Sequence, residues 1–250
     1  MKIAIYIAGH IRTWCDLTKK TLLNFMNGYD VDIFISTHDT LDRQENVDLD
    51  IYKKEKYTAS HDEIKKLFEG LPVKDILIDT DDVEPPIEVD NFRRIAWKMW
   101  RKVYECNEMR KKYEKEHNIS YTYCVRYRPD TVIMQKVEFE KLPPLETNII
   151  GGFGPTLGWP DDLFAIGSPK VMDHYCNLEK ALIPGCGPHK IAGVTFDVYP
   201  IHSFIQTAFI RRTTNHDDYH PRRQIVDFNG KFLTYFIKEE YGHYDYHVIS

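Results

Sequence analysis

Short apolar runs alternate with segments of helical periodicity through the first half of the chain. Residues 2–8 and 31–37 are apolar runs of strand length, while residues 16–27 and 91–117 repeat apolar side chains at spacings of three and four. When strands alternate with helices, each helix carries the chain back to the same end of the sheet, so the strands run parallel. The pattern therefore predicts an α/β fold with a mixed, mostly parallel sheet and helices on both faces.

Further elements are expected along the rest of the chain. Strands are predicted at 75–79, 121–127, 131–134, 148–152 and 163–167, helices at 61–69, 169–182 and 200–211, and a strand pair at 224–236. Ser168 before Pro169 is typical of a helix start, because serine caps the helix and proline fits its first position. Residues 40–60 lack a period and are interpreted as a surface insertion. Residues 110–117 are interpreted as a solvated, charged helix end.

Composition narrows the class of protein. Of the 250 residues, 42% are apolar and 28% are charged, which suits a chain that builds a core and stays in solution. The net charge of −5 does not suit a general nucleic-acid binder. The five cysteines are widely spaced and form no C-x-x-C pair, which favours a reducing compartment. The first apolar run is too short for a signal peptide or an anchor, so no membrane segment and a cytoplasmic location are expected.

Polar residues follow the first predicted strand, and ligands of parallel sheets bind at the carboxyl ends of the strands. Gly9 allows a backbone to approach a ligand closely, and Arg12 could bind a phosphate. His10 or Trp14 could lie against a base. An ordinary strand-to-helix turn with an exposed arginine explains the same residues equally well.

Two further strand ends carry candidate ligand contacts. Thr37 and His38 end the second run, where they could hold a ribose or the edge of a base, although ordinary turn chemistry is the alternative. Arg126 and Arg128 lie on one face of a predicted strand, with Asp130 at its tip. Two arginines and a carboxylate that holds a divalent cation would suit a diphosphate, whereas a buried Arg–Asp network is the structural alternative.

A pair of acids, Asp161 and Asp162, follows a glycine-rich loop at 151–160 and precedes an apolar run. Neighbouring carboxyl groups can raise one another's pKa, which suits a general base that works near neutral pH. A surface turn with two aspartates is the alternative.

Together these segments resemble the small GT-A-type glycosyltransferases of large DNA viruses of algae and of related bacterial and algal proteins. The resemblance is carried, in order, by residues 8–13, 32–38, 125–130 and 161–168. It implies a Rossmann-like GT-A sheet, a nucleotide-sugar donor and a divalent metal, usually Mn2+ and otherwise Mg2+, held by a D-x-D motif. Only Asp130 matches that motif, because the expected position reads Arg-Pro-Asp, and this leaves the need for metal open. His202 is the candidate for the late metal ligand that such enzymes often add.

The resemblance also implies an activity, namely transfer of a sugar from a nucleotide sugar to a hydroxyl of a glycan or another acceptor. Residues 1–250 would form one domain, with a nucleotide-sugar-binding half at 1–135 and an acceptor-binding half at 136–250. Asp162 is the expected base and Asp161 the fallback, in an inverting single displacement, although retaining chemistry stays open.

Two rival functions remain on the sequence. One is a nucleotidyltransferase that forms nucleotide sugars, and the other is a non-catalytic module that binds a nucleotide or a glycan. The oligomeric state is open, and the aromatic residues of segment 235–246 could form a homodimer face.

Overall fold

The computed structural model describes most of residues 1–177 and several separate strands between residues 197 and 249. The described residues are 1–11, 14, 16–42, 56–80, 83–89, 91–129, 131–133, 137–142, 145, 148–153, 160–177, 197–200, 207–209, 223–226, 232–240 and 243–249. At 16–17, 42, 56–57, 91–93, 95, 131–133, 148–153, 160–163 and from 197 on, the description covers the backbone alone.

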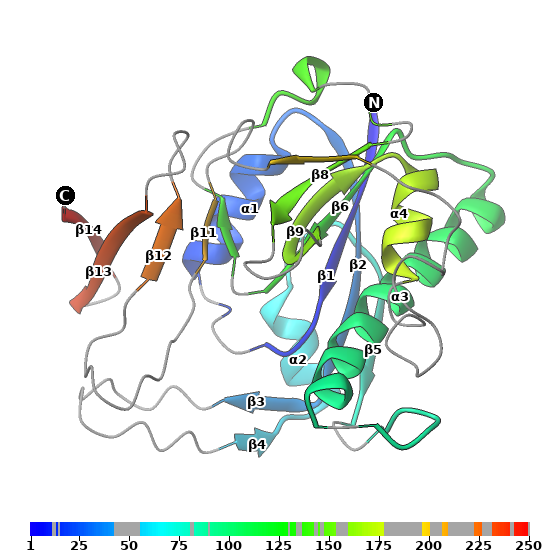
Figure 1. Cartoon of the computed structure of the whole chain (residues 1–250), viewed down its shortest axis with the longest axis horizontal. Coiled ribbons are helices and arrows are strands. Elements are labelled where there is room, and N and C mark those ends of the chain that lie inside the picture. The colour runs from blue at the N-terminus through cyan, green and yellow to red at the C-terminus, as the bar shows by residue number, and fades with distance from the viewer. Residues whose placement is uncertain are drawn as a thin grey trace.

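A seven-stranded sheet forms the centre of the fold (Figure 1). Its strands are β1 (Lys2–Ala8), β2 (Asp30–His38), β5 (Val73–Asp79), β6 (Tyr123–Tyr127), β8 (Asn148–Phe153), β9 (Pro160–Gly167) and β10 (Asp197–Pro200), in the order β10-β8-β9-β6-β1-β2-β5. β6, β1, β2 and β5 run parallel, and β10 runs parallel to β8. β9 alone runs against its neighbours β6 and β8. The prediction of a mixed, mostly parallel sheet is therefore confirmed.

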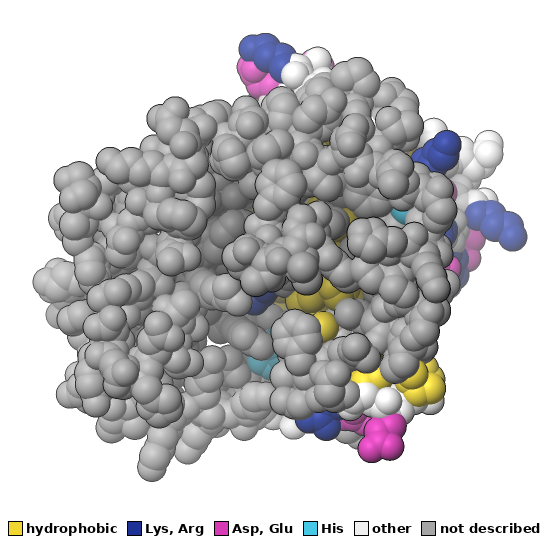
Figure 2. All heavy atoms as spheres, in the orientation of Figure 1, with side chains coloured by type: hydrophobic (Ala, Val, Ile, Leu, Met, Phe, Trp, Pro, Cys, Tyr) yellow, Lys and Arg dark blue, Asp and Glu magenta, His cyan; other side chains and the backbone are white. Residues whose placement is uncertain are grey.

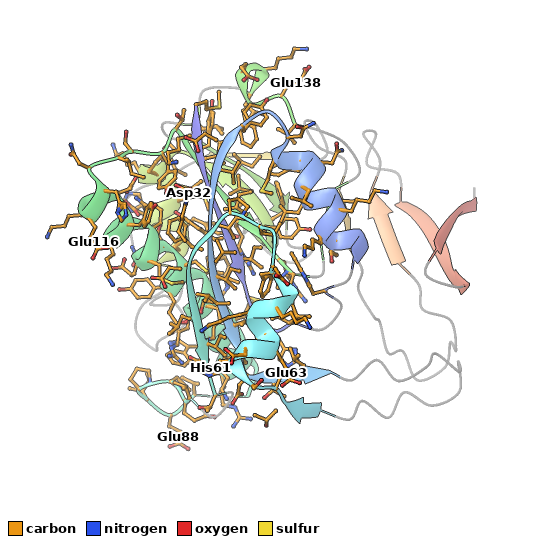
Figure 3. The ribbon with its side chains drawn as sticks, turned by 180° about the vertical axis from the view of Figure 1, so that it is seen from behind. Asp32, His61, Glu63, Glu88, Glu116 and Glu138 are labelled. Atoms are coloured by element: carbon orange, nitrogen blue, oxygen red, sulfur yellow. The ribbon has the colours of Figure 1, made fainter. Side chains whose placement is uncertain are left out.

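Helices cover both faces of this sheet (Figures 1 and 3). Successive side chains of β1 point to opposite faces, so Ile3, Ile5 and Ile7 join one buried cluster and Ala4, Tyr6 and Ala8 join another. The first cluster includes side chains of α1 (Asp16–Met26) and α2 (His61–Leu67), and the second includes side chains of α3 (Asn91–His117) and α4 (Pro169–Cys176). None of the helices in the described part of the chain has the length and apolar character that a membrane crossing requires.

The helix ends follow local signals in the sequence. Ser60 begins α2 with a capping box, in which its hydroxyl accepts from the Glu63 backbone N–H and Glu63 accepts from the Ser60 backbone. Ser168 caps α4 in the same way through Val171, with Pro169 at the first helical position, as predicted. Gly28 follows α1 with φ +91°, a conformation that favours glycine at a helix end.

The later strands form a second, antiparallel sheet. It contains β7 (Thr131–Ile133), β11 (Thr207–Phe209), β12 (Arg223–Val226), β13 (Phe232–Glu240) and β14 (His243–Ile249), in the order β14-β13-β12-β11-β7. The helix predicted at 200–211 is wrong, because residue 200 ends β10 and β11 pairs with β7 and β12. Cross-strand pairing overrides local helical spacing there. The strand pair expected at 224–236 is present as β12 and the first part of β13.

The segment interpreted as a surface insertion begins and ends in regular structure. β3 (Thr40–Asp42) pairs with β4 (Lys56–Thr58) in an antiparallel ladder, and residues 43–55 lie outside the described part. Leu41 and Ala59 are both buried, so the two ends of the segment pack on the core. A short 3-10 helix at Phe139–Lys141 buries Phe139 against Phe25 of α1.

A buried carboxylate fixes the amino end of the sheet. Asp32 of β2 accepts a hydrogen bond from the Tyr121 hydroxyl (2.7 Å) and pairs with the ammonium groups of Lys2 (2.9 Å) and Lys74 (3.3 Å). Burial raises the pKa of Asp32, but hydrogen bonds from Lys2, Tyr121 and Lys74 outweigh burial and lower it. Figure 3 shows Asp32 among the strands, whereas Glu116 and Glu138 lie at the periphery.

Adjacent leucines of α1 give a matched test of the core. Leu22 is fully buried beneath the sheet, whereas Leu23 is 42% exposed. Leu22→Ala should lower the free energy of unfolding by roughly 2–5 kcal/mol, because it removes buried methyl groups and leaves a cavity. Leu23→Ala should change it by less than about 0.5 kcal/mol. Urea unfolding followed by circular dichroism measures both, and equal losses would contradict the assignment of the α1 face.

Candidate functional site

The strand order defines where a ligand would bind. From β1 the chain builds the sheet outward through β2 and β5, and it then returns to the other side of β1 with β6. The carboxyl ends of β1 and β6 are therefore the point at which the strand order reverses. Open α/β sheets bind their ligands in the crevice outside the strand ends at such a point. In Figure 2, which shares the orientation of Figure 1, histidine and basic side chains are visible between other atoms near the place where β1 ends.

Gly9 and Arg126 flank this reversal point. Gly9 follows β1 with φ +118°, which favours glycine, and its N–H donates to the Ser36 carbonyl at 3.0 Å. A Cβ at Gly9 would lie 4.0 Å from Nη2 of Arg126, so the loop backbone runs beside the guanidinium. The Arg126 side chain is fully buried and donates from Nη1 to the Tyr127 carbonyl at 2.9 Å. Arg128, two residues on, is half-buried.

At the neighbouring strand ends, Asp79 contacts three nitrogen groups. The carboxylate lies 3.2 Å from Nδ1 of His38 and 3.0 Å from Nη2 of Arg101, and it forms an ion pair with Nζ of Lys102. Burial raises the pKa of Asp79, but hydrogen bonds from His38 and Lys102 outweigh burial and lower the pKa to about 2. Asp79 is therefore ionised at neutral pH.

Glu105 is the second carboxylate of this cluster. It accepts from Oγ of Ser36 at 2.5 Å and from Nζ of Lys102 at 3.1 Å, and it lies 2.8 Å from Nη2 of Arg101. The Lys102 side chain has no exposed surface, so its ammonium is stable only because two carboxylates hold it. We call this cluster the polar layer; it consists of Ser36, His38, Asp79, Arg101, Lys102 and Glu105.

Histidines lie beside each other at the ends of β1 and β2. The ring centroids of His10 and His38 are 6.2 Å apart. Thr37 lies between Ser36 and His38 and points to the opposite face of the strand, where its buried hydroxyl has no hydrogen-bond partner among the described residues. Of the pair predicted at the end of β2, only His38 belongs to the polar layer.

Trp14 connects the loop after β1 to the end of α2. Its indole N–H donates to the Leu67 carbonyl at 3.1 Å, and its ring packs 4.9 Å from the ring of Phe68. These contacts fasten the loop to the end of α2. His10 is therefore the aromatic residue of this loop that lies near the polar layer.

The antiparallel course of β9 brings the acid pair to the same edge of the sheet. Phe164 of β9 pairs with Tyr127 at the end of β6, so the residues before Phe164 continue past that end. The backbone of Asp161 and Asp162 consequently lies at the carboxyl edge, within β9 and not in the turn before it. Their side chains lie outside the described part.

Three predicted site residues, Arg12, Asp130 and His202, also lie outside the described residues. Within the part that the structure describes, no group of three or more His, Cys, Asp or Glu side chains could hold a metal ion.

The sequence did not single out Asp79 or the charged residues of α3 at 101–105. The spacing of Arg101 and Glu105 suits an ion pair within the helix, but such pairs are common on solvated faces. The sequence signal that could have identified Asp79 is its position at the end of the apolar run 75–79, where a ligand of the sheet would bind.

No protein-family model matches this chain, and no curated protein matches it.

The polar layer predicts a specific dependence of stability on pH. The folded-state pKa of Asp79 is about 2 against an ordinary value of 3.8, so ionised Asp79 contributes about 2 kcal/mol above pH 4, and this is lost as the pH falls toward 2. Asp79→Asn should therefore destabilise the protein most at pH 7, and its deficit should shrink below pH 4. Urea unfolding from pH 7 to 2.5 measures this, with Asp75→Asn on the same strand as control. A deficit that is constant with pH would contradict the ion pairs of Asp79.

Proposed function

We propose that this chain is a GT-A-type glycosyltransferase that transfers a sugar from a nucleotide-sugar donor to a hydroxyl of a glycan or another acceptor. The observation that carries the proposal is that the backbone of Gly9 lies beside the buried guanidinium of Arg126, at the point where the strand order reverses. A backbone that can approach closely, beside a fixed cation, suits the diphosphate of such a donor. Because the chain carries a net charge of −5, local arginines must supply the attraction.

The order of groups along the carboxyl edge supports this assignment. The strands β9, β6, β1 and β2 are neighbours, and they carry in turn the acid pair, Arg126, Gly9 with His10, and His38. A nucleotide sugar has the matching order of sugar, diphosphate and nucleoside. The diphosphate would lie at Arg126 and Arg128, the nucleoside over His10 and His38, and the sugar toward β9. Thr37 stays a predicted ribose contact, although its side chain points to the opposite face of β2 from His38. Arg12 stays a predicted phosphate contact.

The chemistry follows from this arrangement. Asp162, with Asp161 as the fallback, takes the proton of the acceptor hydroxyl, whose oxygen attacks the anomeric carbon while the bond to the diphosphate breaks. The departing diphosphate gains negative charge, which a buried guanidinium stabilises more strongly than an exposed one. Attack opposite the leaving group inverts the anomeric centre. A divalent cation, Mn2+ or Mg2+, at Asp130 and His202 stays a prediction, and it would neutralise charge on the same diphosphate.

Donor binding tests the arginine. In a thermal-shift screen of UDP-, GDP-, CMP- and dTDP-sugars with and without Mn2+, one nucleotide family should raise the melting temperature. Saturation at a hundredfold excess over the dissociation constant stabilises the folded state by about 2.7 kcal/mol. Arg126→Lys should reduce the shift, because lysine lacks the planar fork that binds two phosphate oxygens. Arg94→Lys, on a largely exposed part of α3, should leave it unchanged. No shift with any nucleotide sugar would contradict the donor site.

Turnover tests the acid pair. Asp162→Asn should lower the rate of sugar transfer by roughly 10²–10⁴-fold, the usual contribution of a general base, while the donor still binds. Transfer is measured as release of the nucleoside diphosphate in the presence of candidate glycan acceptors, and Asp161→Asn tests the fallback residue in the same assay. Wild-type rates in Asp162→Asn would remove this residue as the base. Donor binding without turnover in the wild type would favour a binding module, and exchange of pyrophosphate would favour a nucleotidyltransferase.

A further inference from the structure

The loop that follows β1 closes off the Arg126 guanidinium. The Arg126 side chain has no exposed surface, and a Cβ placed at Gly9 would lie 4.0 Å from its Nη2 atom, which is ordinary van der Waals contact. The space between the Gly9 backbone and Nη2 therefore holds no more than a methyl group. A phosphate group is larger than a methyl group, so a diphosphate cannot bind Nη2 on this side while the loop keeps its place.

Two side chains hold the loop in this place. The Ile11 side chain is 4% exposed and belongs to the apolar cluster on the α1 and α2 face of the sheet. Trp14 is only partly buried, and its indole N–H donates to the Leu67 carbonyl at the end of α2 at 3.1 Å. Both contacts are made by the closed loop, and both must be given up if the loop moves away from Arg126.

Gly9 is suited to be the hinge of such a movement. Its N–H stays fixed to the sheet, because it donates to the Ser36 carbonyl at 3.0 Å. Its φ of +118° lies where glycine is favoured, and glycine also adopts other backbone conformations at little cost. The chain can therefore turn at Gly9 while β1 keeps its pairing with β2.

We propose that the loop beginning at Gly9 is a lid over Arg126, held shut by Ile11 and Trp14, and that the donor diphosphate binds only when the lid is open. The inference rests on the proposed function, which supplies the diphosphate. The ligand takes the space that the closed loop fills, so the lid stays open in the complex. The apparent dissociation constant is then the intrinsic one divided by the open fraction. Weakening a contact that shuts the lid consequently tightens donor binding.

The first test needs no ligand. Phenylglyoxal modifies arginine side chains that solvent reaches, and peptide mass spectrometry follows its initial rate at Arg126 and at Arg94, whose side chain is 48% exposed. Ile11→Val removes one buried methylene and Trp14→Phe removes one hydrogen bond, so each should raise the rate at Arg126 roughly fivefold. The rate at Arg94 should stay unchanged.

Matched substitutions elsewhere in the core control for a general loss of stability. Ile5→Val in β1 and Trp100→Phe in α3 remove the same kinds of group from buried positions, and they should leave the rate at Arg126 unchanged. A wild-type rate at Arg126 equal to that at Arg94 would overturn the lid. Equal rates at Arg126 in the wild type and in both lid variants would overturn it as well.

The second test measures binding. Calorimetry compares UDP, GDP and dTDP on the wild type, on the two lid variants and on the two controls. The nucleoside diphosphate that binds the wild type should bind Ile11→Val and Trp14→Phe roughly fivefold more tightly, and the controls with wild-type affinity. A loop that is preformed to grip the ligand predicts the opposite sign. Unchanged or weaker binding in both lid variants would therefore overturn the lid.

The outcomes separate the inference from the proposed function. Binding to the wild type without a gain in the lid variants would overturn the lid while leaving the glycosyltransferase proposal standing. Absence of binding to the wild type and to both lid variants would contradict the proposed donor site. The labelling of Arg126 would then still decide whether the loop opens.

Discussion

β1 is enclosed along both of its edges and on both of its faces. It is hydrogen-bonded to β2 along one edge and to β6 along the other, and the side chains from Ile3 to Ala8 are buried beneath helices on both faces. Such a strand can carry only apolar or internally bonded side chains, and its backbone polar groups must be paired within the sheet. At the carboxyl end of β1, the described residues leave the loop that begins at Gly9 as the place where this part of the chain can meet a ligand. The site is therefore set by the enclosure of one strand.

The polar layer lies where that enclosure ends, and stability is a weak explanation for it. Burying the Lys102 ammonium carries a desolvation cost, and replacing buried ion pairs by apolar side chains is often neutral or stabilising. A cluster of this kind is better explained by what it holds in place. Asp79 and Glu105 connect α3 to the ends of β5 and β2, so the first half of the long helix and the strand ends form one rigid support.

The sequence predicted six of the seven strands of the first sheet, because burial on both faces demands continuous apolar runs, which are easy to recognise; it did not predict β10. It could not predict which charged side chains of α3 turn inward. Arg110, interpreted as part of a solvated helix end, is buried and bonds to the Tyr6 hydroxyl (3.0 Å) and to Asp173 (2.5 Å). Its burial depends on partners from β1 and α4, which are distant in the sequence. The same limit applies to Asp79 and Lys102.

The sequence predicted those parts of the candidate site that lie at the ends of recognisable apolar strands. The strand ends at Gly9, His38 and Arg126 follow from the apolar runs, and they do lie on neighbouring strands. That Asp161 and Asp162 reach the same edge depends on the antiparallel direction of β9, which no local pattern reveals. Likewise, the spacing of apolar residues at 200–211 suited a helix, but pairing with β7 and β12 decided for a strand.

The register of β1 also bears on how the chain is assembled during synthesis. Ile3 pairs with Val31 on one side and with Tyr123 on the other, so one edge of the strand stays open until a distant segment has been made. At ordinary rates of translation this interval is on the order of ten seconds. An apolar strand with an open edge is a template for pairing with other chains. The central strand thus emerges before its sheet partners and is completed late, and during that interval its open edge is exposed to pairing with other chains.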